Sequence, residues 1–113
     1  MTYGPQRLVL SRARELVANP STWTKCAVAR DARGMPCLPH QSRAVRFCAY
    51  GAMWRAAYEL TGDTRAAYEL AIGTERLVMR RTSAPRRARI ATINDRFGRL
   101  AVLGVLAESA RSP

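Results

Sequence analysis

Residues 47–54 read Phe47-Cys48-Ala49-Tyr50-Gly51-Ala52-Met53-Trp54 and contain no charged side chain. A helix that is apolar on every side is surrounded by other elements of its fold. We therefore expect a central core helix that begins after Ser42, its predicted N-cap, and continues through Leu60. Gly51 costs such a helix about 1 kcal/mol relative to alanine, so we expect another backbone to approach closely there.

An amphipathic helix is predicted before this segment. Pro5 suits a first helical turn, and the helix should end at Asn19-Pro20, because the residue before a proline disfavours the helical region. Its expected core positions follow the three-and-four spacing of a helix: Leu8, Val9, Ala13, Leu16 and Val17. Arg7, Arg14 and Glu15 fall largely on the other side.

A third helix is predicted after the central one. At the break, Gly62 should end the central helix and Asp63 should cap the next. The apolar positions recur with a helical period at Ala66/Ala67, Leu70/Ala71, Thr74 and Leu77/Val78. Arg65 and Glu69 form an i,i+4 pair on the outer face, and Gly73 is a potential kink.

Residues 26–39 are expected to form a short β-hairpin. Asp31 and Gly34 occupy the first and fourth positions of a type I turn. Pro36 confines the second strand to an edge, because it has no N–H to donate to a further strand. A single hairpin is not stable alone, so it must pack on the helices.

A last helix is predicted from a capping box at Thr92-Ile93-Asn94-Asp95, and we interpret Asn94 and Asp95 as capping residues rather than catalytic groups. Its apolar face comprises Phe97, Leu100, Ala101, Gly104 and Ala107, widened by Leu103 and Leu106. The expected fold is mainly α (α+β), a single small basic domain over residues 1–113. About four helices pack around a central apolar helix, with one short β-hairpin after the first helix.

The chain is strongly basic, with a formal net charge of +11, and Lys25 is its only lysine. Residues 76–113 hold nine arginines against Asp95 and Glu108, an excess of +7, and residues 82–89 form an arginine-rich loop. We expect a patch made by Arg76, Arg80, Arg81, Arg86, Arg87 and Arg89. Guanidinium groups grip phosphate or carboxylate bidentately, so the patch predicts an acidic partner. The alternative is a solvated face that only keeps the protein soluble.

The leading functional hypothesis is a non-enzymatic binding module that docks these arginines on an acidic partner, with nucleic acid slightly favoured over protein. Few aromatic side chains lie near the patch and no helix-turn-helix pattern is present, so contacts would be mostly to the backbone and sensitive to salt. A second hypothesis is a phage or mobile-element adaptor or inhibitor that binds an acidic protein surface. A cryptic enzyme is disfavoured, since no nucleophile motif or phosphate loop is present, and no cofactor is expected.

A zinc site is the alternative interpretation of the cysteines. Cys37 and His40 have a C-x-x-H spacing that Cys26 and Cys48 could complete. Zinc sites usually show two tight pairs, so we favour reduced thiols, with Cys48 as a buried apolar residue. We interpret His40 as an exposed loop residue. Both tryptophans, at positions 23 and 54, are expected to pack on the core.

No apolar run approaches the ~18–20 residues that a membrane span needs, and charged residues interrupt the N-terminal region. We therefore expect a cytoplasmic protein with no membrane partner.

Several short patterns together resemble a known family. They are Arg14-Glu15-Leu16 with Asn19-Pro20 and Trp23; Ala29-Arg30-Asp31 with Gly34 and Pro36; Ala44-Val45-Arg46-Phe47-Cys48 with Gly51-Ala52; and Asn94-Asp95. The family consists of small bacterial and phage-encoded proteins and is known only as a domain of unknown function. A tryptophan often precedes the Asn-Asp pair in that family, whereas Ile93 stands here. The resemblance covers nearly the whole chain and implies an intact single domain, but no activity.

Overall fold

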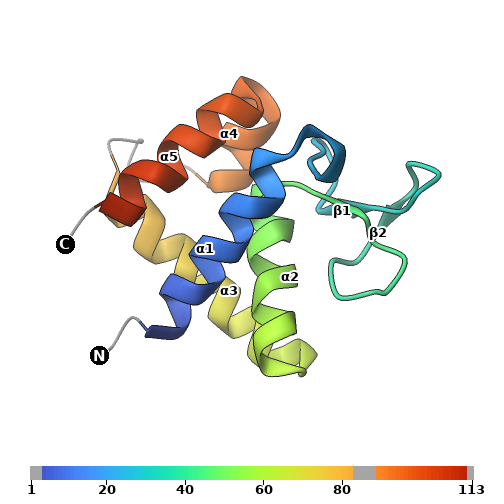
Figure 1. Ribbon diagram of the computed structural model, residues 1–113, viewed down its shortest axis with the longest axis horizontal. Coiled ribbons are helices and arrows are strands. Elements are labelled where there is room, and N and C mark those ends of the chain that lie inside the picture. The colour runs from blue at the N-terminus through green and yellow to red at the C-terminus, as the bar shows by residue number, and fades with distance from the viewer. Residues whose placement is uncertain (1–3, 83–88, 112–113) are drawn as a thin grey trace.

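The computed structural model describes residues 4–82 and 89–111, and within them five α-helices surround a core while a small sheet lies at one side (Figure 1). The elements in chain order are α1 (Gly4–Ala18), the 3-10 turn η1 (Pro20–Thr22), β1 (Ala29–Arg30), β2 (Pro36–Cys37), β3 (Arg46–Phe47), α2 (Ala49–Thr61), α3 (Thr64–Arg80), α4 (Ile90–Phe97) and α5 (Arg99–Arg111). The mainly helical α+β class predicted from the sequence is confirmed.

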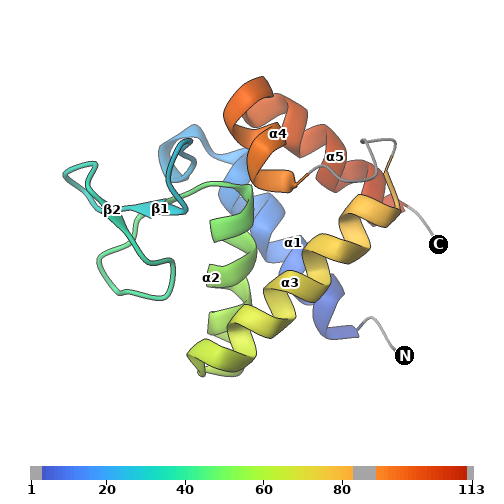
Figure 2. The same ribbon diagram turned by 180° about the vertical axis from the view of Figure 1, so that it is seen from behind.

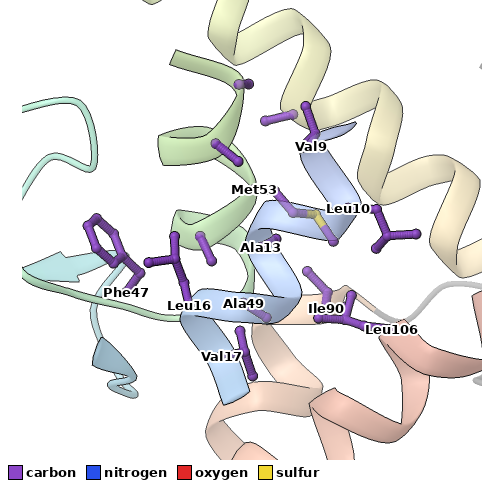
Figure 3. Packing of buried hydrophobic residues seen from close by; sticks show 14 of the residues in the cluster. Val9, Leu10, Ala13, Leu16, Val17, Phe47, Ala49, Met53, Ile90 and Leu106 are labelled. Atoms are coloured by element: carbon purple, nitrogen blue, oxygen red, sulfur yellow. The ribbon is translucent and has the colours of Figure 1, made fainter. Parts of the chain in front are cut away.

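Helix α2 lies at the centre, between the small sheet and α3 (Figure 2). Figure 3 shows Met53 of α2 directed toward α1, where it joins Leu10 and Ala13 in one buried cluster that also takes in Ile90 of α4 and Leu106 of α5. Gly51 allows the backbone of Val28 to approach α2 closely, as predicted. A Cβ added there would overlap the carbonyl oxygen of Val28 and lie 2.8 Å from its carbonyl carbon.

The central helix begins later than predicted. Ser42 is not its N-cap; Cys48 is, and the Cys48 Sγ accepts a hydrogen bond from the Gly51 N–H at 3.3 Å. The residues just before it form β3, which pairs antiparallel with β1 in the register Ala29 to Phe47. Pairing with β1 uses backbone N–H and C=O groups that a helix starting after Ser42 would need for its own hydrogen bonds. For example, the Val45 N–H donates to the Arg30 carbonyl oxygen at 2.9 Å.

The predicted hairpin is confirmed, although it is part of a larger sheet. Strands β1 and β2 pair antiparallel, and the strand order β2-β1-β3 leaves Pro36 on an edge. At the turn the Asp31 carboxylate accepts hydrogen bonds from the N–H groups of Arg33 and Met35, and Gly34 has a φ of 83°. The third strand, β3, was not predicted from the sequence.

The first and third helices match their predicted ranges closely. In α1 the buried apolar residues are Val9, Leu10, Ala13, Leu16 and Val17. The prediction was therefore wrong for Leu8, which is exposed. Gly62 ends α2 in the left-handed region and the Asp63 side chain caps α3, both as predicted. Helix α3 runs through Gly73 to Arg80 without a break, so Gly73 does not split it.

The C-terminal region forms two helices where one was predicted. Residues 92–95 lie inside α4, so they are not a capping box. Gly98, with φ 89° and ψ −178°, separates α4 from α5 in a conformation that is essentially restricted to glycine. Because the chain turns at Gly98, the side that is buried after it differs from the apolar face predicted for one continuous helix. Phe97 and Leu100 are 71% and 72% exposed, while Val102 and Leu106 are fully buried.

Within residues 4–82 and 89–111, none of the helices combines the length and the apolar character that crossing a bilayer requires.

Candidate functional site

The six arginines predicted to form the patch have different environments. Arg76 and Arg80 are exposed and lie four residues apart, so they share one face of α3. Arg81 is partly buried at the C-terminal end of the same helix. Arg86 and Arg87 lie outside the described residues. Of the predicted patch, the structure therefore describes Arg76 and Arg80 on one face of α3, Arg81 at the end of that helix, and Arg89 before α4.

Arg89 is engaged within the fold. Its Nε lies 3.0 Å from both carboxylate oxygens of Glu75, and its Nη2 lies 2.8 Å from Glu75 Oε1. The Glu75 side chain is only 5% exposed, and it also accepts the N–H of Ile90 at 3.0 Å. The hydrogen bonds that Arg89 donates to Glu75 raise the pKa of Arg89. Arg89 thus joins the start of α4 to α3, while 60% of its side chain is exposed.

Arg99, a further arginine of the C-terminal third, also has a structural role. Its Nη1 donates to the carbonyl oxygen of Ala18 at 2.8 Å, at the C-terminal end of α1. A cation there satisfies carbonyl groups that lack a helical partner and interacts favourably with the helix dipole. The charge excess in residues 76–113 is therefore larger than the charge available to a partner.

The structure adds two arginines that sequence reasoning had placed only on the outer face of the first helix. A cavity of about 200 Å³ opens between α1, α3 and α5, and Arg7 and Arg14 of α1 line it together with Arg81 of α3. The other lining residues are Gln6, Leu10, Ser11, Leu77, Ser109 and Ala110. In Figures 1 and 2 the C-terminal ends of α3 and α5 lie close together, and both helices contribute residues to the lining of this cavity. The seven-residue spacing of Arg7 and Arg14 was the available sequence signal, because it puts both on one helix face.

Two residues beside this cavity each have a buried polar atom without a hydrogen-bond partner. These atoms are the Oγ of Ser109 and the Oε1 of Gln6. Ser109 has no exposed surface at all. A buried polar group without a partner costs about 1–3 kcal/mol, so groups of this kind call for an explanation.

Asn94 and Asp95 form a structural junction rather than a catalytic pair. The Asn94 Oδ1 accepts the indole N–H of Trp23 at 2.8 Å and the backbone N–H of Ala49 at 3.0 Å. Its Nδ2 donates to the Thr24 carbonyl oxygen at 3.1 Å. Asn94 therefore does cap a helix, but the helix is α2 and not its own.

Asp95 completes this junction. Its Oδ1 accepts the backbone N–H of Cys26 at 2.9 Å and the Asn94 Nδ2–H at 3.1 Å. Cys26 has a φ of 63°, in the left-handed region that residues other than glycine seldom adopt. The carboxylate of Asp95 thus stabilises the bend that brings residues 23–26 to the start of α2. An indole does lie beside the Asn-Asp pair, and Trp23 supplies it from another part of the chain.

The four residues weighed as zinc ligands are not brought together. Cys26 is exposed, whereas Cys37 and Cys48 are buried, and burial raises the pKa of the Cys48 thiol. Among the described residues no group of three His, Cys, Asp or Glu side chains is placed to hold a metal ion. His40 was predicted to be exposed, but it is partly buried, and its ring centroid lies 5.6 Å from those of Trp54 and Tyr58. Trp23 and Trp54 pack against the core as predicted.

Comparison with known proteins agrees with the resemblance seen in the sequence. No curated protein and no solved structure matches the chain. One family model does match, over residues 1–112, and its description is a family of unknown function (DUF6197). The match extends over almost the whole chain, from α1 to the end of α5, and so includes both the cavity and the Asn94 junction. The protein therefore belongs to this family of unknown function.

Proposed function

We propose that the protein is a non-enzymatic binding module that docks an arginine-bearing face of α1 and α3 on an acidic partner, preferentially the phosphate backbone of nucleic acid. We define this arginine face as Arg7, Arg14, Arg76, Arg80 and Arg81. The observation that carries the proposal is that helices far apart in the chain bring Arg7 and Arg14 to the same cavity as Arg81, while α3 also carries the exposed Arg76 and Arg80.

The state of the side chains supports this proposal. Arg7, Arg14, Arg76 and Arg80 are exposed, and no carboxylate among the described residues pairs with them. By contrast, Arg12 of the same helix pairs with Glu59 at 3.0 Å and with Glu15 at 3.1 Å. Unpaired guanidinium groups on a rigid helix face can neutralise several phosphates and release the condensed counterions.

Fluorescence anisotropy with a labelled 20-bp duplex and a single strand of equal length tests the proposal. We expect micromolar binding at 50 mM NaCl that weakens steeply by 200 mM, because each neutralised phosphate contributes to the salt dependence. The variant Arg76→Gln/Arg80→Gln should bind at least about tenfold more weakly, with a shallower salt slope.

The matched control is Arg33→Gln/Arg46→Gln, which removes the same charge from two exposed arginines on the sheet side of the molecule. It should retain most of the affinity. Equal losses in the two variants would show that only net charge matters, and no micromolar binding at 50 mM NaCl would reject nucleic acid as the partner.

An acidic protein surface is the second candidate partner, as for an adaptor or inhibitor. The exposure of Phe97 and Leu100 at the corner between α4 and α5 favours it, because exposed large apolar side chains are typical of protein contacts. A pull-down that survives nuclease treatment and is lost in Phe97→Ser/Leu100→Ser would support this partner. Loss of every captured protein after nuclease treatment would reject it.

A further inference from the structure

The small sheet and its loops form a second basic region of the molecule. Residues 24–47 contain five basic side chains and one acid, Asp31, giving a net charge of +4. The other residues of the first 75 hold five basic and five acidic side chains, so they add no net charge. Figures 1 and 2 show the sheet at the opposite end of the molecule from the C-terminal ends of α3 and α5. The proposed function uses none of the residues of this region.

The positive charge of this region is not neutralised inside the fold. Within residues 4–82 and 89–111 no carboxylate pairs with its five cations, which are Lys25, Arg30, Arg33, Arg43 and Arg46. Arg30 and Arg46 stand directly opposite each other in the register of β1 and β3, an arrangement that destabilises a sheet. Arg30 donates to neutral oxygens, those of the Gly34 carbonyl at 2.9 Å and the Thr24 hydroxyl at 3.0 Å. An acidic partner would relieve the repulsion.

An open groove of about 430 Å³ lies beside β2 in this region. Its lining residues are Pro36, Cys37, Leu38, Gln41 and Arg43. Three of them are apolar, and the exposed Arg43 is the charged one. The Arg43 Nε donates to Gln41 Oε1 at 3.3 Å, so its two terminal nitrogens can hold a carboxylate bidentately. The groove therefore offers an apolar wall with a cationic fork next to it.

The edge of β2 does not offer a partner the backbone donors that strand addition needs. The Asp31 N–H bonds the Met35 carbonyl, so by the antiparallel alternation residues 36 and 38 direct their backbone groups away from β1. Pro36 has no N–H, and the Leu38 N–H donates to Gln41 Oε1 at 3.0 Å. A partner is therefore recognised here by side chains and not by an added strand.

Exposed apolar side chains distinguish this region from a surface that only attracts phosphates. Met35, Leu38 and Val45 are large, apolar and exposed in the loops of the sheet. Methionine and arginine are both enriched at protein–protein interfaces, whereas contacts to a phosphate backbone need no apolar groove. Apolar groups among unpaired arginines fit a protein segment that has both acidic and apolar side chains.

We infer that the groove beside β2 binds an acidic peptide segment of a partner protein, with an apolar side chain of the segment against Pro36 and Leu38 and a neighbouring carboxylate on Arg43. The other arginines of the region attract the remaining acidic groups of the segment and raise the rate of association. This inference does not depend on nucleic-acid binding by the arginine face, because the two sites share no residue.

Fluorescence anisotropy with three labelled peptides of equal length tests the inference. Their central residues are Asp-Glu-Leu-Glu-Asp, the neutral counterpart Asn-Gln-Leu-Gln-Asn, and Asp-Glu-Ser-Glu-Asp, which lacks the apolar side chain. We expect the first peptide to bind with a Kd below about 100 μM at 50 mM NaCl and the other two to bind at least about tenfold more weakly. Equal affinity for the three peptides, or no binding of any at millimolar concentration, would overturn the inference.

The variant Leu38→Ser/Arg43→Gln should weaken the first peptide at least about tenfold. Its matched control is Leu60→Ser/Arg65→Gln, since Leu60 is 47% exposed against 45% for Leu38, and Arg65 is also an exposed arginine. The control should stay within about twofold of wild type. Equal losses in the two variants would mean that the groove is not the site.

The thermal midpoint of each variant reports its fold. Should the double variant lose its structure, Arg43→Gln alone carries the test, because its exposed side chain makes one long hydrogen bond to Gln41. This variant should weaken the peptide about fivefold, and an unchanged affinity would overturn the inference.

Competition with the labelled 20-bp duplex separates this site from the arginine face. We expect Leu38→Ser/Arg43→Gln to keep its duplex affinity, whether that affinity is high or absent in the wild type. Displacement of the bound peptide by the duplex, together with loss of duplex affinity in this variant, would assign the groove to nucleic acid and overturn the inference of a peptide site.

Discussion

Gly51 allows α2 to pack closely against the backbone of Val28, the residue just before β1. Gly51→Ala should destabilise the protein by about 1–3 kcal/mol, because its Cβ would overlap the Val28 carbonyl group in a packed region. Urea unfolding measures the difference. Gly104→Ala is the matched control, since a Cβ there meets nothing within 4 Å in α5 and should stabilise by about 0.5–1 kcal/mol. Equal effects of the two substitutions would contradict the packing role of Gly51.

Asn94 is the second residue with a decisive role. Its side chain on α4 forms hydrogen bonds with Trp23, with the Thr24 backbone and with the start of α2 at Ala49. Asn94→Ala leaves the Trp23 indole N–H and the Ala49 backbone N–H without their acceptor. We expect a loss of about 2–6 kcal/mol in the free energy of unfolding, the sum of two unsatisfied buried donors. Chemical denaturation followed by tryptophan fluorescence measures it. Asn19→Ala, at an exposed cap of η1, should cost only about 1 kcal/mol, and a similar cost at both sites would contradict the proposed junction.

At the scale of elements, the contact between α1 and α2 includes a charged hydrogen-bond network centred on Glu59. Burial would raise the pKa of Glu59, but hydrogen bonds from Arg12 and Arg55 outweigh it, and the pKa is lowered from its ordinary value of 4.5. A lowered folded-state pKa stabilises the protein above the unfolded-state value, and this contribution disappears as the pH falls through the folded-state pKa.

The difference in stability between wild type and Glu59→Gln should therefore be largest near pH 7 and decrease as the pH falls through the lowered folded-state pKa of Glu59. Urea titrations at pH 7, 5 and 3 measure the difference. Glu69→Gln, which breaks only the exposed Arg65–Glu69 pair at 3.6 Å, should stay within about 0.5 kcal/mol of wild type at pH 7. A wild-type advantage that grew toward low pH would contradict the sign of this linkage.

The second link between elements joins α3 to α4 across residues 83–88. Glu75 is a buried acid on α3, and it holds both Arg89 and the N–H of Ile90 at the start of α4. Because Ile90 belongs to the core cluster, this ion pair places α4 and the Asn94 side chain that α4 carries. One of the six arginines predicted for partner binding thus contributes to the position of a helix.

The whole molecule carries a formal charge of +11 within a radius of gyration of 12.7 Å. The Debye length is about 10 Å at 0.1 M salt, so at lower salt the charges repel one another across the whole molecule. Raising NaCl from about 20 to 200 mM should increase the thermal midpoint by about 2–5 °C, as the repulsion is screened. Differential scanning calorimetry measures the midpoint.

A variant with four exposed arginines replaced by glutamine (Arg33, Arg46, Arg76 and Arg80) should show a smaller increase with salt, since less repulsion remains to be screened. A midpoint that falls as NaCl rises would instead mean that ion pairs such as Arg12–Glu59 outweigh the repulsion.

Local chemistry was sufficient to predict much of this fold. The first helix, the Gly62-Asp63 break, the Asp31 turn and the close approach at Gly51 each depend on residues within a few positions of one another. Propensity, capping and steric rules act over that distance, so the sequence expresses them directly. Short sequence patterns likewise indicated the family, which the match over residues 1–112 shows.

Tertiary structure alone decided the rest. Arg46 and Phe47 form a strand only because β1 offers its edge, and Arg89 pairs inward only because folding brings Glu75 to it. The cavity gathers Arg7 and Arg14 with Arg81 and Ser109 from the other end of the chain. Such contacts depend on closing long loops and packing several helices together, and helical periodicity specifies which face of a helix is buried but not which element covers it.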